Sequence, residues 1–416
     1  MGETEPRASV RNGRVLIVGA GIAGPTLAFW LAHHGFTPTV VERSRQVRGG
    51  GQAIDVHGRA VDVLTKMGLL DAARAARTGI RGMDFVNARG RTVARTTAFS
   101  LTGGAADDPG IELMRSDLAT LLLDSTRATT EYVYGDHPVA LEQTGTAVTV
   151  GFASGSVREF DLVVGADGIR SATRSLAFPA DSHRLHRLGR YIAIGDVPNF
   201  LGYDRWETFY AAGPDRRVCY FAGAGSTRVM FTRTDPDLDV DQYDDEGLRA
   251  LLRSHFAGDG WQTDRLLDEI TATPDFYFDD LRQVHMDFWH LGRVALVGDA
   301  GYCASPSSGL GTTLAVVGAY VLAGELAAAH GDHHLGFARY DRRMRPFVAD
   351  CQERARRGGN LYVTRPRFWL QMQQIRLSNL PPLRRVMTGL AAGSKERIGM
   401  GITLPGDDRN TGSPIP

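Results

Sequence analysis

Apolar positions near the start of the chain predict a strand, a helix and a second strand, in that order. Residues 14–18 form an apolar run that ends at Gly19, which is typical of a strand buried on both faces. Helical spacing continues over residues 22–34 and stops at Gly35, and a second strand-like run covers residues 39–42. A unit of this size is typical of a β-α-β motif, which implies a parallel sheet and an α/β fold.

The next part of the chain predicts further helices and then a β-rich stretch. Helical apolar spacing covers residues 58–68, and residues 116–125 are expected to form a helix that Ser116 caps. Short β-rich runs separated by Gly and Ser fill residues 131–164. We interpret these runs as a meander that returns to the parallel sheet.

A change of pattern indicates a second, antiparallel domain inserted in the first. From residue 190 to residue 233, β-rich runs alternate with turn residues, whereas a parallel-type apolar strand resumes at Val294. Residues 309–358 are mostly helical, and the Gly/Pro-rich tail from about residue 400 is expected to be poorly ordered. The first domain is therefore predicted to be interrupted and then completed.

Length and composition narrow the class of protein. The 416 residues exceed the usual size of one hydrophobic core, so two packed domains are expected. Equal numbers of acidic and basic side chains, 47 of each, leave no net charge for binding nucleic acid. Three scattered cysteines and no Cys/His cluster in the sequence argue against disulfides and a metal site, and they fit a reducing cytoplasm.

Two segments of the sequence decide whether a secretory signal or a membrane-spanning helix is expected. Residues 1–12 are polar and lack the apolar core of a secretory signal. Residues 300–324 carry no charged side chain, but the first half of this stretch is a Gly/Ser/Pro-rich loop. We therefore expect a buried helix there rather than a membrane span, and no membrane partner.

A glycine-rich motif follows the first predicted strand and comprises Gly19, Gly21, Ile22, Ala23 and Gly24. Its three glycines permit a tight turn, the approach of a pyrophosphate to the backbone, and close packing of helix on strand. The helix start offers unpaired N–H groups to the phosphates. Glu42 ends the next strand, where a carboxylate accepts hydrogen bonds from ribose hydroxyls. This agreement predicts a bound dinucleotide rather than a glycine-rich turn beside a solvated acid.

Two later segments decide which dinucleotide is expected. Residues 161–171 and 292–300 each contain a strand-like run followed by glycine and aspartate. Together with the first motif, they resemble the flavoprotein monooxygenases of the para-hydroxybenzoate hydroxylase type, over about residues 14–350. That group includes aromatic and polyketide hydroxylases and a tetracycline-inactivating branch. The resemblance implies tightly but non-covalently bound FAD.

The resemblance also implies the domain organisation. A Rossmann-like FAD-binding domain of the glutathione-reductase type would be interrupted by an antiparallel β-sheet substrate domain and followed by helices. The expected boundaries are 12–72, 103–178 and 281–345 for the FAD-binding domain, 73–102 and 179–280 for the substrate domain, and 346–416 for the C-terminal helical segment and tail.

Cofactor contacts follow from the same resemblance. Asp299 would hydrogen-bond the ribityl chain, Arg115 would reach the phosphates or the ribityl chain, and Arg43 would stack on adenine. The isoalloxazine ring would lie against a flavin loop and helix start that contain Pro306, Gly309, Leu310 and Gly311. Independently of the resemblance, a helix N-terminus at this place would stabilise the negative charge of reduced flavin.

Two of the residues implied to contact the cofactor also have a structural explanation. Asp55 resembles a position near the ribityl chain and flavin in the tetracycline-inactivating branch, but a solvated loop acid explains it as well. Asp167, Gly168 and Arg170 match the motif that serves FAD and the transient binding of NADPH. Asp167 is equally suited to cap the segment that follows it.

The reaction implied by the resemblance is monooxygenation. NADPH or NADH would reduce FAD, O2 would add at flavin C4a, and the hydroperoxide would transfer one oxygen atom to an aromatic or polyketide-like molecule, antibiotics included. Such chemistry needs no metal or catalytic triad, and the sequence identifies no catalytic residue beyond the flavin loop. Tyr210, Tyr220 and Phe221 are candidates for lining the substrate cavity, although core packing explains them equally well. His57 and Cys303 are interpreted as structural.

Two kinds of alternative function stay open at this point: another flavin enzyme of the same fold, and a protein that is not an enzyme. Flavin-dependent halogenases carry a Trp-rich motif and an active-site lysine that this sequence lacks, since Lys66 and Lys395 lie at unsuitable positions. A flavin-dependent reductase or dehydrogenase of the same fold and a non-catalytic flavin- or ligand-binding protein are the alternatives. NADPH-dependent O2 consumption would distinguish the monooxygenase from a binding protein. Monomer and homodimer are equally compatible with the sequence.

Overall fold

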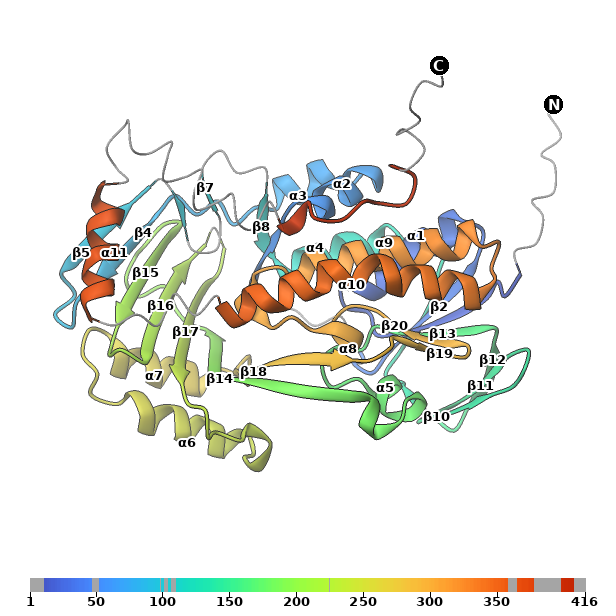
Figure 1. The fold of residues 1–416 in the computed structure, drawn as a ribbon. Helices are drawn as coiled ribbons and strands as arrows, with labels where there is room; N and C mark the ends of the chain where they lie inside the picture. The colour runs from blue at the N-terminus through green and yellow to red at the C-terminus, as the bar shows by residue number, and fades with distance from the viewer. Residues whose placement is uncertain are drawn as a thin grey trace, which may run out of the picture.

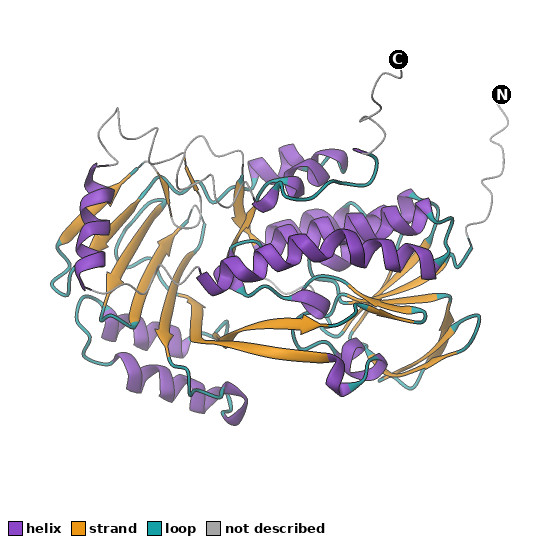
Figure 2. Cartoon of the chain, in the orientation of Figure 1, coloured by secondary structure: helices purple, strands orange, loops and turns teal. Residues whose placement is uncertain are grey.

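The computed structural model describes residues 11–46, 52–97, 99–100, 104–105, 110–223, 225–357, 365–377 and 398–407. Two bodies of secondary structure lie side by side, one built on a parallel sheet covered by helices and the other on an antiparallel sheet (Figures 1 and 2). A long ribbon made of β14 (His183–Asp196) and β18 (Tyr277–Met286) runs from one body to the other (Figure 1).

The first sheet has six strands in the order β19-β20-β13-β1-β2-β9. The strands are β1 (Arg14–Val18), β2 (Thr37–Glu42), β9 (Glu131–Tyr134), β13 (Leu162–Gly165), β19 (His290–Leu291) and β20 (Val294–Leu296). Only β19 pairs in the antiparallel sense. The apolar run of β1 is buried between β2 and β13, as its pattern predicts. Because the parallel strands end at one edge, the loops that follow them lie together there.

Helices bury the apolar faces of this sheet and of one another. They are α1 (Ala23–His33), α2 (Arg59–Lys66), α3 (Leu70–Ala75), α4 (Arg115–Asp124), α9 (Gly311–Ala328) and α10 (His333–Arg357). The apolar helix α9 packs against α1, α2 and α10. Within the described ranges, α9 is the one helix with the length and hydropathy of a membrane span, and 67% of that stretch is buried inside the protein. This burial agrees with the buried helix expected here.

Several smaller elements accompany the two large sheets. Of the β-rich stretch 131–164, β9 pairs with β2 in the parallel sheet, and the residues after it form a three-stranded antiparallel meander that leads directly into β13. The strands of this meander are β10 (Pro138–Gln143), β11 (Val148–Phe152) and β12 (Val157–Phe160). The remaining small elements are β3 (Ala53–Val56) paired with β8 (Ile111–Met114), β6 (Phe99–Ser100) paired with β7 (Gly104–Ala105), the helices α5 (Ala172–Ala177) and α8 (Asp299–Tyr302), and 3-10 turns at Ala180–Ser182, Val240–Gln242 and Pro306–Ser308.

The second large sheet has seven strands in the order β18-β14-β17-β16-β15-β4-β5. The elements not yet given are β4 (Met83–Val86), β5 (Thr92–Thr96), β15 (Trp206–Ala211), β16 (Arg216–Ala222), β17 (Thr227–Thr234), α6 (Asp245–Phe256), α7 (Thr263–Ala272) and α11 (Arg365–Leu377). Helices α6 and α7 cover the outer face of this sheet (Figure 1). Because side chains alternate along a strand, every second residue faces these helices and the others face the first body.

Two local expectations differ from the structure. Helix α4 begins one residue earlier than predicted, and Ser116 lies in its first turn instead of capping it, because β8 runs straight into the helix. The tail is packed over residues 398–407: Leu404 is fully buried, and a Cβ on Gly58 would lie 2.4 Å from the carbonyl carbon of Gly399. Residues 408–416 lie outside the described residues.

Candidate active site

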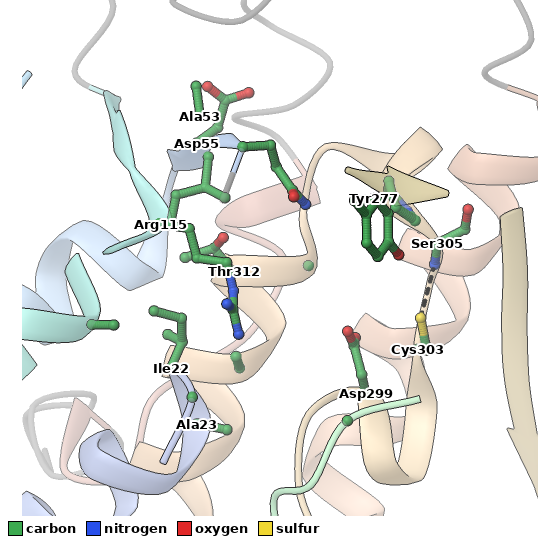
Figure 3. Close-up of a pocket in the computed structure, with 18 of the residues that line it drawn as sticks. Ile22, Ala23, Ala53, Asp55, Arg115, Tyr277, Asp299, Cys303, Ser305 and Thr312 are labelled. Carbon is green, nitrogen blue, oxygen red and sulfur yellow. Dashed lines mark hydrogen bonds between the residues drawn. The ribbon is translucent and has the colours of Figure 1, made fainter. Parts of the chain in front are cut away.

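A cavity of about 1310 Å³ lies between the carboxyl edge of the parallel sheet and the inner face of the seven-stranded sheet. This volume exceeds the ~300–1,000 Å³ that is usual for one drug-sized ligand. It therefore has room for a large cofactor together with a second molecule. Figure 3 shows Ile22, Arg115, Tyr277 and Asp299 around this space, contributed by segments far apart in the sequence.

The glycine-rich motif forms the floor of one end of the cavity. Gly19 has φ +107°, and a Cβ there would lie 2.6 Å from the carbonyl oxygen of Ala166, so the turn requires glycine. A Cβ on Gly24 would lie 1.9 Å from the carbonyl oxygen of Gly19, which makes this glycine a packing residue outside the cavity. Ile22 and Ala23 line the cavity where α1 starts without a side-chain cap. The backbone N–H groups of this turn are suited to phosphate.

Glu42 holds this loop in place. Its carboxylate accepts the backbone N–H of Ala20 at 2.9 Å and that of Ser44 at 2.8 Å, one on each oxygen. Each oxygen keeps a second lone pair, so the carboxylate can still accept ribose hydroxyls. Arg43 is exposed at the same end of the cavity. Glu42 thus fixes the glycine loop and, at the same time, lies where the adenosine end of a dinucleotide is predicted.

Arg115 and Asp299 approach the middle of the cavity from opposite walls (Figure 3). A Cβ on Gly21 would lie 3.4 Å from Nη2 of Arg115, so the guanidinium sits directly above the glycine loop. The Asp299 side chain is open to the cavity, but its depth in the protein raises the pKa of the carboxyl by desolvation, which a hydrogen bond from Cys303 and the charge of Arg115 partly oppose. A cation suited to phosphates and an acceptor suited to a polyol chain therefore face each other across the middle of the cavity.

We expect Asp299→Asn to stabilise the FAD-free protein at neutral pH. The raised pKa means that the folded FAD-free protein binds this proton more tightly than the unfolded chain does. The stability contributed by this group is therefore complete below the ordinary aspartate pKa and is lost as pH rises through the raised value. Thermal denaturation of FAD-free protein should show the variant melting at a higher temperature than the wild type at neutral pH, with no difference in acid. Asp71→Asn, at a fully exposed carboxylate, is the control, and equal melting at every pH would contradict the expectation.

Asp167 is engaged in capping, the alternative that its sequence position offered. Its carboxylate accepts Ser171 Oγ at 2.5 Å, Thr173 N at 2.9 Å and Thr173 Oγ1 at 3.0 Å, at the start of α5. Asp167 and Gly168 nevertheless line the cavity. Arg174 of the same helix donates to the carbonyl oxygens of Ile169 and Ala300, both at 2.7 Å. These two hydrogen bonds tie the segment 161–171 to the segment 292–300.

The predicted flavin loop borders the cavity next to α9. Pro306, Gly309 and Gly311 line the cavity, whereas Leu310 is fully buried in the core and does not. Gly309 adopts the left-handed conformation with φ +65°, and no side chain caps the N-terminus of α9. The uncapped helix start therefore offers backbone N–H groups to a bound anionic group.

Three further sequence candidates are placed by the structure. Asp55 lines the cavity, and its Oδ2 lies 3.6 Å from Nε2 of His57. His57 is 4% exposed and does not line the cavity, and its backbone N–H donates to Thr313 Oγ1. Cys303 does line it, but burial raises the pKa of its thiol well above the ordinary value. The thiol therefore stays protonated and unreactive, as a passive side chain would.

The aromatic residues suggested for the substrate wall divide between the two faces of the sheet. Phe221 lines the cavity. Tyr210 and Tyr220 do not, since they are buried on the face covered by α6 and α7, where Tyr210 hydroxyl donates to the carbonyl oxygen of Asp259. For these two the packing alternative agrees with the structure. Adjacent residues of one strand cannot share a face, which separates Tyr220 from Phe221.

Several cavity residues carry no recognisable motif and were missed by the sequence reasoning. The inner face of the sheet contributes Ile192, Ile194, Arg228, Met230, Thr232, Tyr277 and Leu281. Alternation within β14 and β17 was the available signal, because residues 192 and 194, like 228, 230 and 232, are spaced by two. Tyr277 hydroxyl donates to Asp279 Oδ2 at 3.2 Å, and burial together with this carboxylate raises the pKa of the phenol.

Comparison with known proteins agrees with this site. Residues 12–355 match the family model of the FAD binding domain. The chain is 46% identical to an uncharacterised protein of Mycobacterium tuberculosis strain H37Rv, over 80% of this chain and 90% of that protein. It is 40% identical to a flavin-dependent monooxygenase from an unknown prokaryotic organism, over 80% of this chain and 86% of the relative.

Solved structures give the same result. The tetracycline destructase Tet(55) superposes with a TM-score of 0.83 and 33% identity, covering 94% of this chain and 98% of that one. HpxO of Klebsiella pneumoniae, solved with FAD and uric acid, shares the fold with a TM-score of 0.69 and 23% identity, covering 92% of this chain and 96% of HpxO. The chain therefore belongs to the FAD binding domain family, among the flavoprotein monooxygenases of the para-hydroxybenzoate hydroxylase type.

Proposed function

We propose that this protein uses FAD, NADPH or NADH, and O2 to insert one oxygen atom into a planar, largely apolar small molecule of the aromatic or polyketide type. The observation that carries the proposal is the continuity of the cavity, which joins a dinucleotide-type floor to an apolar sheet face. The named relatives and the tetracycline destructase support it.

The protein's part in this reaction is binding, orientation and exclusion of water. FAD, when bound, supplies the redox chemistry and the activation of O2. The glycine loop and Arg115 would hold its phosphates, Glu42 its ribose and Asp299 its ribityl hydroxyls, because these groups already line one side of the cavity. The uncapped start of α9 would stabilise negative charge on the ring. Ile194 and Met230 would keep the opposite wall dry around the substrate.

The experiment that tests the proposal is a screen of polycyclic phenols and tetracyclines with the FAD-loaded protein. We expect at least one compound to stimulate NADPH or NADH oxidation and to gain one oxygen atom by mass spectrometry. The gain should disappear without O2, because O2 is the proposed source of the inserted atom. Stimulated NADPH oxidation with hydrogen peroxide as the only oxygen product for every compound would contradict the proposal, and so would a complete absence of stimulation.

A further inference from the structure

The backbone of residues 303–309, which leads into α9, is held from behind by buried amide side chains. The carbonyl oxygen of Cys303 accepts the backbone N–H of Val284 at 3.0 Å and Nε2 of Gln352 at 3.3 Å. The carbonyl oxygen of Ala304 accepts Nε2 of Gln283 at 3.3 Å. Both glutamines are buried. The first carbonyl oxygens of this loop are therefore turned into the interior of the protein and away from the cavity.

The far end of the loop is held by an arginine of α10. The carbonyl oxygen of Ser308 accepts Nε of Arg354 at 2.9 Å. Arg354 lies in the last turn of α10, which packs against the 3-10 turn of the loop, and it lines the cavity. On the other side of the same peptide group, the backbone N–H of Gly309 donates to the carbonyl oxygen of Pro306 at 3.0 Å. The peptide group between Ser308 and Gly309 is thus fixed at both its oxygen and its nitrogen.

The backbone conformation of the loop explains why such contacts are needed. Ser305 has φ +74°, which residues other than glycine rarely adopt. Gly309 has φ +65°, and glycine adopts either sign of φ with similar ease, so the peptide group before it can turn over at low cost. Unfavourable or easily reversed conformations persist where the surrounding contacts determine them. The hydrogen bonds from β18 and α10 therefore select the conformation in which the loop meets the cavity.

This conformation decides the sign of the potential beside the flavin site. Gly311 and Thr312 line the cavity at the uncapped start of α9, where backbone N–H groups and the helix dipole give positive potential. A carbonyl oxygen carries partial negative charge. If the Ser308 carbonyl turned towards the cavity, it would oppose the start of α9 and make negative charge on a reduced flavin less favourable.

We propose that Arg354 is a positioning residue for the flavin, whose Nε–H holds the Ser308 carbonyl away from the ring and so makes bound FAD easier to reduce. Arg354 acts here through the loop backbone. Arg170 also lines the cavity, but its Nη1 and Nη2 donate to Asp279 of β18, both at 3.0 Å, so it does not serve this loop. The assignment rests on the proposed function, because that function places the flavin ring against the loop.

The test separates the hydrogen bond from the charge by comparing Arg354→Gln with Arg354→Met. Nε2 of glutamine occupies the place of arginine Nε along the side chain and can donate to the Ser308 carbonyl, whereas methionine has similar length and no donor. Both variants lack the charge. Anaerobic reduction of the FAD-loaded proteins against a redox dye, without substrate or NADPH, measures the midpoint potential. Relative to oxidised FAD, the Gln variant should hold reduced FAD about tenfold more tightly than the Met variant, a difference of about 30 mV for two electrons.

The matched control is the same pair of substitutions at Arg356. Nε of Arg356 donates to Glu353 Oε2 at 2.9 Å and lies on the same turn of α10, so Arg356→Gln and Arg356→Met should have equal midpoint potentials. Arg354→Ala introduces no new contact and should match Arg354→Met, which keeps the test available if methionine prevents folding.

Equal midpoint potentials for Arg354→Gln and Arg354→Met would overturn the assignment, and so would Arg354→Ala matching Arg354→Gln. Loss of FAD from Arg354→Met alone would support it, whereas loss of FAD from both variants would show that the charge and not the hydrogen bond is required. These are equilibrium measurements without substrate. The assignment can therefore fail while oxygen insertion stands, and a failed screen for oxygen insertion leaves the potentials unchanged.

Discussion

Gly24→Val should yield a protein that is purified without FAD and is destabilised by about 3 kcal/mol or more. Even a single Cβ at this position would lie 1.9 Å from the carbonyl oxygen of Gly19, and no side-chain movement can relieve a contact with backbone. Helix α1 would have to move away from β1, which displaces the turn that is proposed to hold the phosphates. The ratio of visible flavin absorbance to protein absorbance and thermal denaturation measure the two effects.

The control for this experiment is Gly145→Ala. Gly145 lies in a turn with open space around its would-be Cβ and has no positive φ, so alanine should change neither FAD content nor melting temperature by much. A Gly24→Val protein that retains a full complement of FAD would refute the packing role of Gly24 and with it the dinucleotide assignment of the glycine loop.

Arg115→Met should weaken FAD binding by about 10- to 100-fold, the range expected when hydrogen bonds to a charged group are removed. Arg115 is placed above Gly21, where a phosphate would approach the backbone, and methionine preserves most of the side-chain volume without the charge. Titration of FAD-free protein with FAD, followed by flavin fluorescence, measures the affinity. Salt should weaken FAD binding less in the variant than in the wild type, because a charge–charge contact has been removed.

Arg127→Met provides the comparison for Arg115. Arg127 follows the same helix α4, is highly exposed and pairs with Asp124, so its replacement should leave FAD affinity and the salt dependence unchanged. An equal loss of affinity in both variants would point to a general charge effect. Unchanged affinity in Arg115→Met would show that the guanidinium does not contact the cofactor.

Local sequence patterns were sufficient to predict the body that is built on the parallel sheet. The strand that ends at Gly19 is buried on both faces, and this forces an uninterrupted apolar run that can be read without any tertiary information. The same holds for α9, whose apolar residues face protein all round. By contrast, the expected cap at Ser116 failed because β8 leads into α4 without a loop, and a cap residue needs a loop to precede it.

The substrate side of the cavity was harder to predict because the same residue types serve both faces of the sheet. Tyr210 and Tyr220 have the size and chemistry of ligand contacts, yet only strand register decides that they face α6 and α7. Nothing in the sequence distinguishes Arg228 from other charged strand residues, and only the pairing of β17 with β16 places it beside Phe221. The glycine motifs, in contrast, can be recognised from the sequence alone, because the local backbone conformation of the turn requires glycine.

The packed segment 398–407 has a consequence for the order in which the molecule is assembled. Ile398 lines the cavity, Tyr320 of α9 donates to the carbonyl oxygen of Pro405, and Arg59 of α2 donates to that of Ile402. The wall around the proposed cofactor site therefore includes a segment that is synthesised long after the glycine loop. Domains fold as units from the N-terminus during synthesis, so the site can close around a cofactor only after residues 398–407 have left the ribosome.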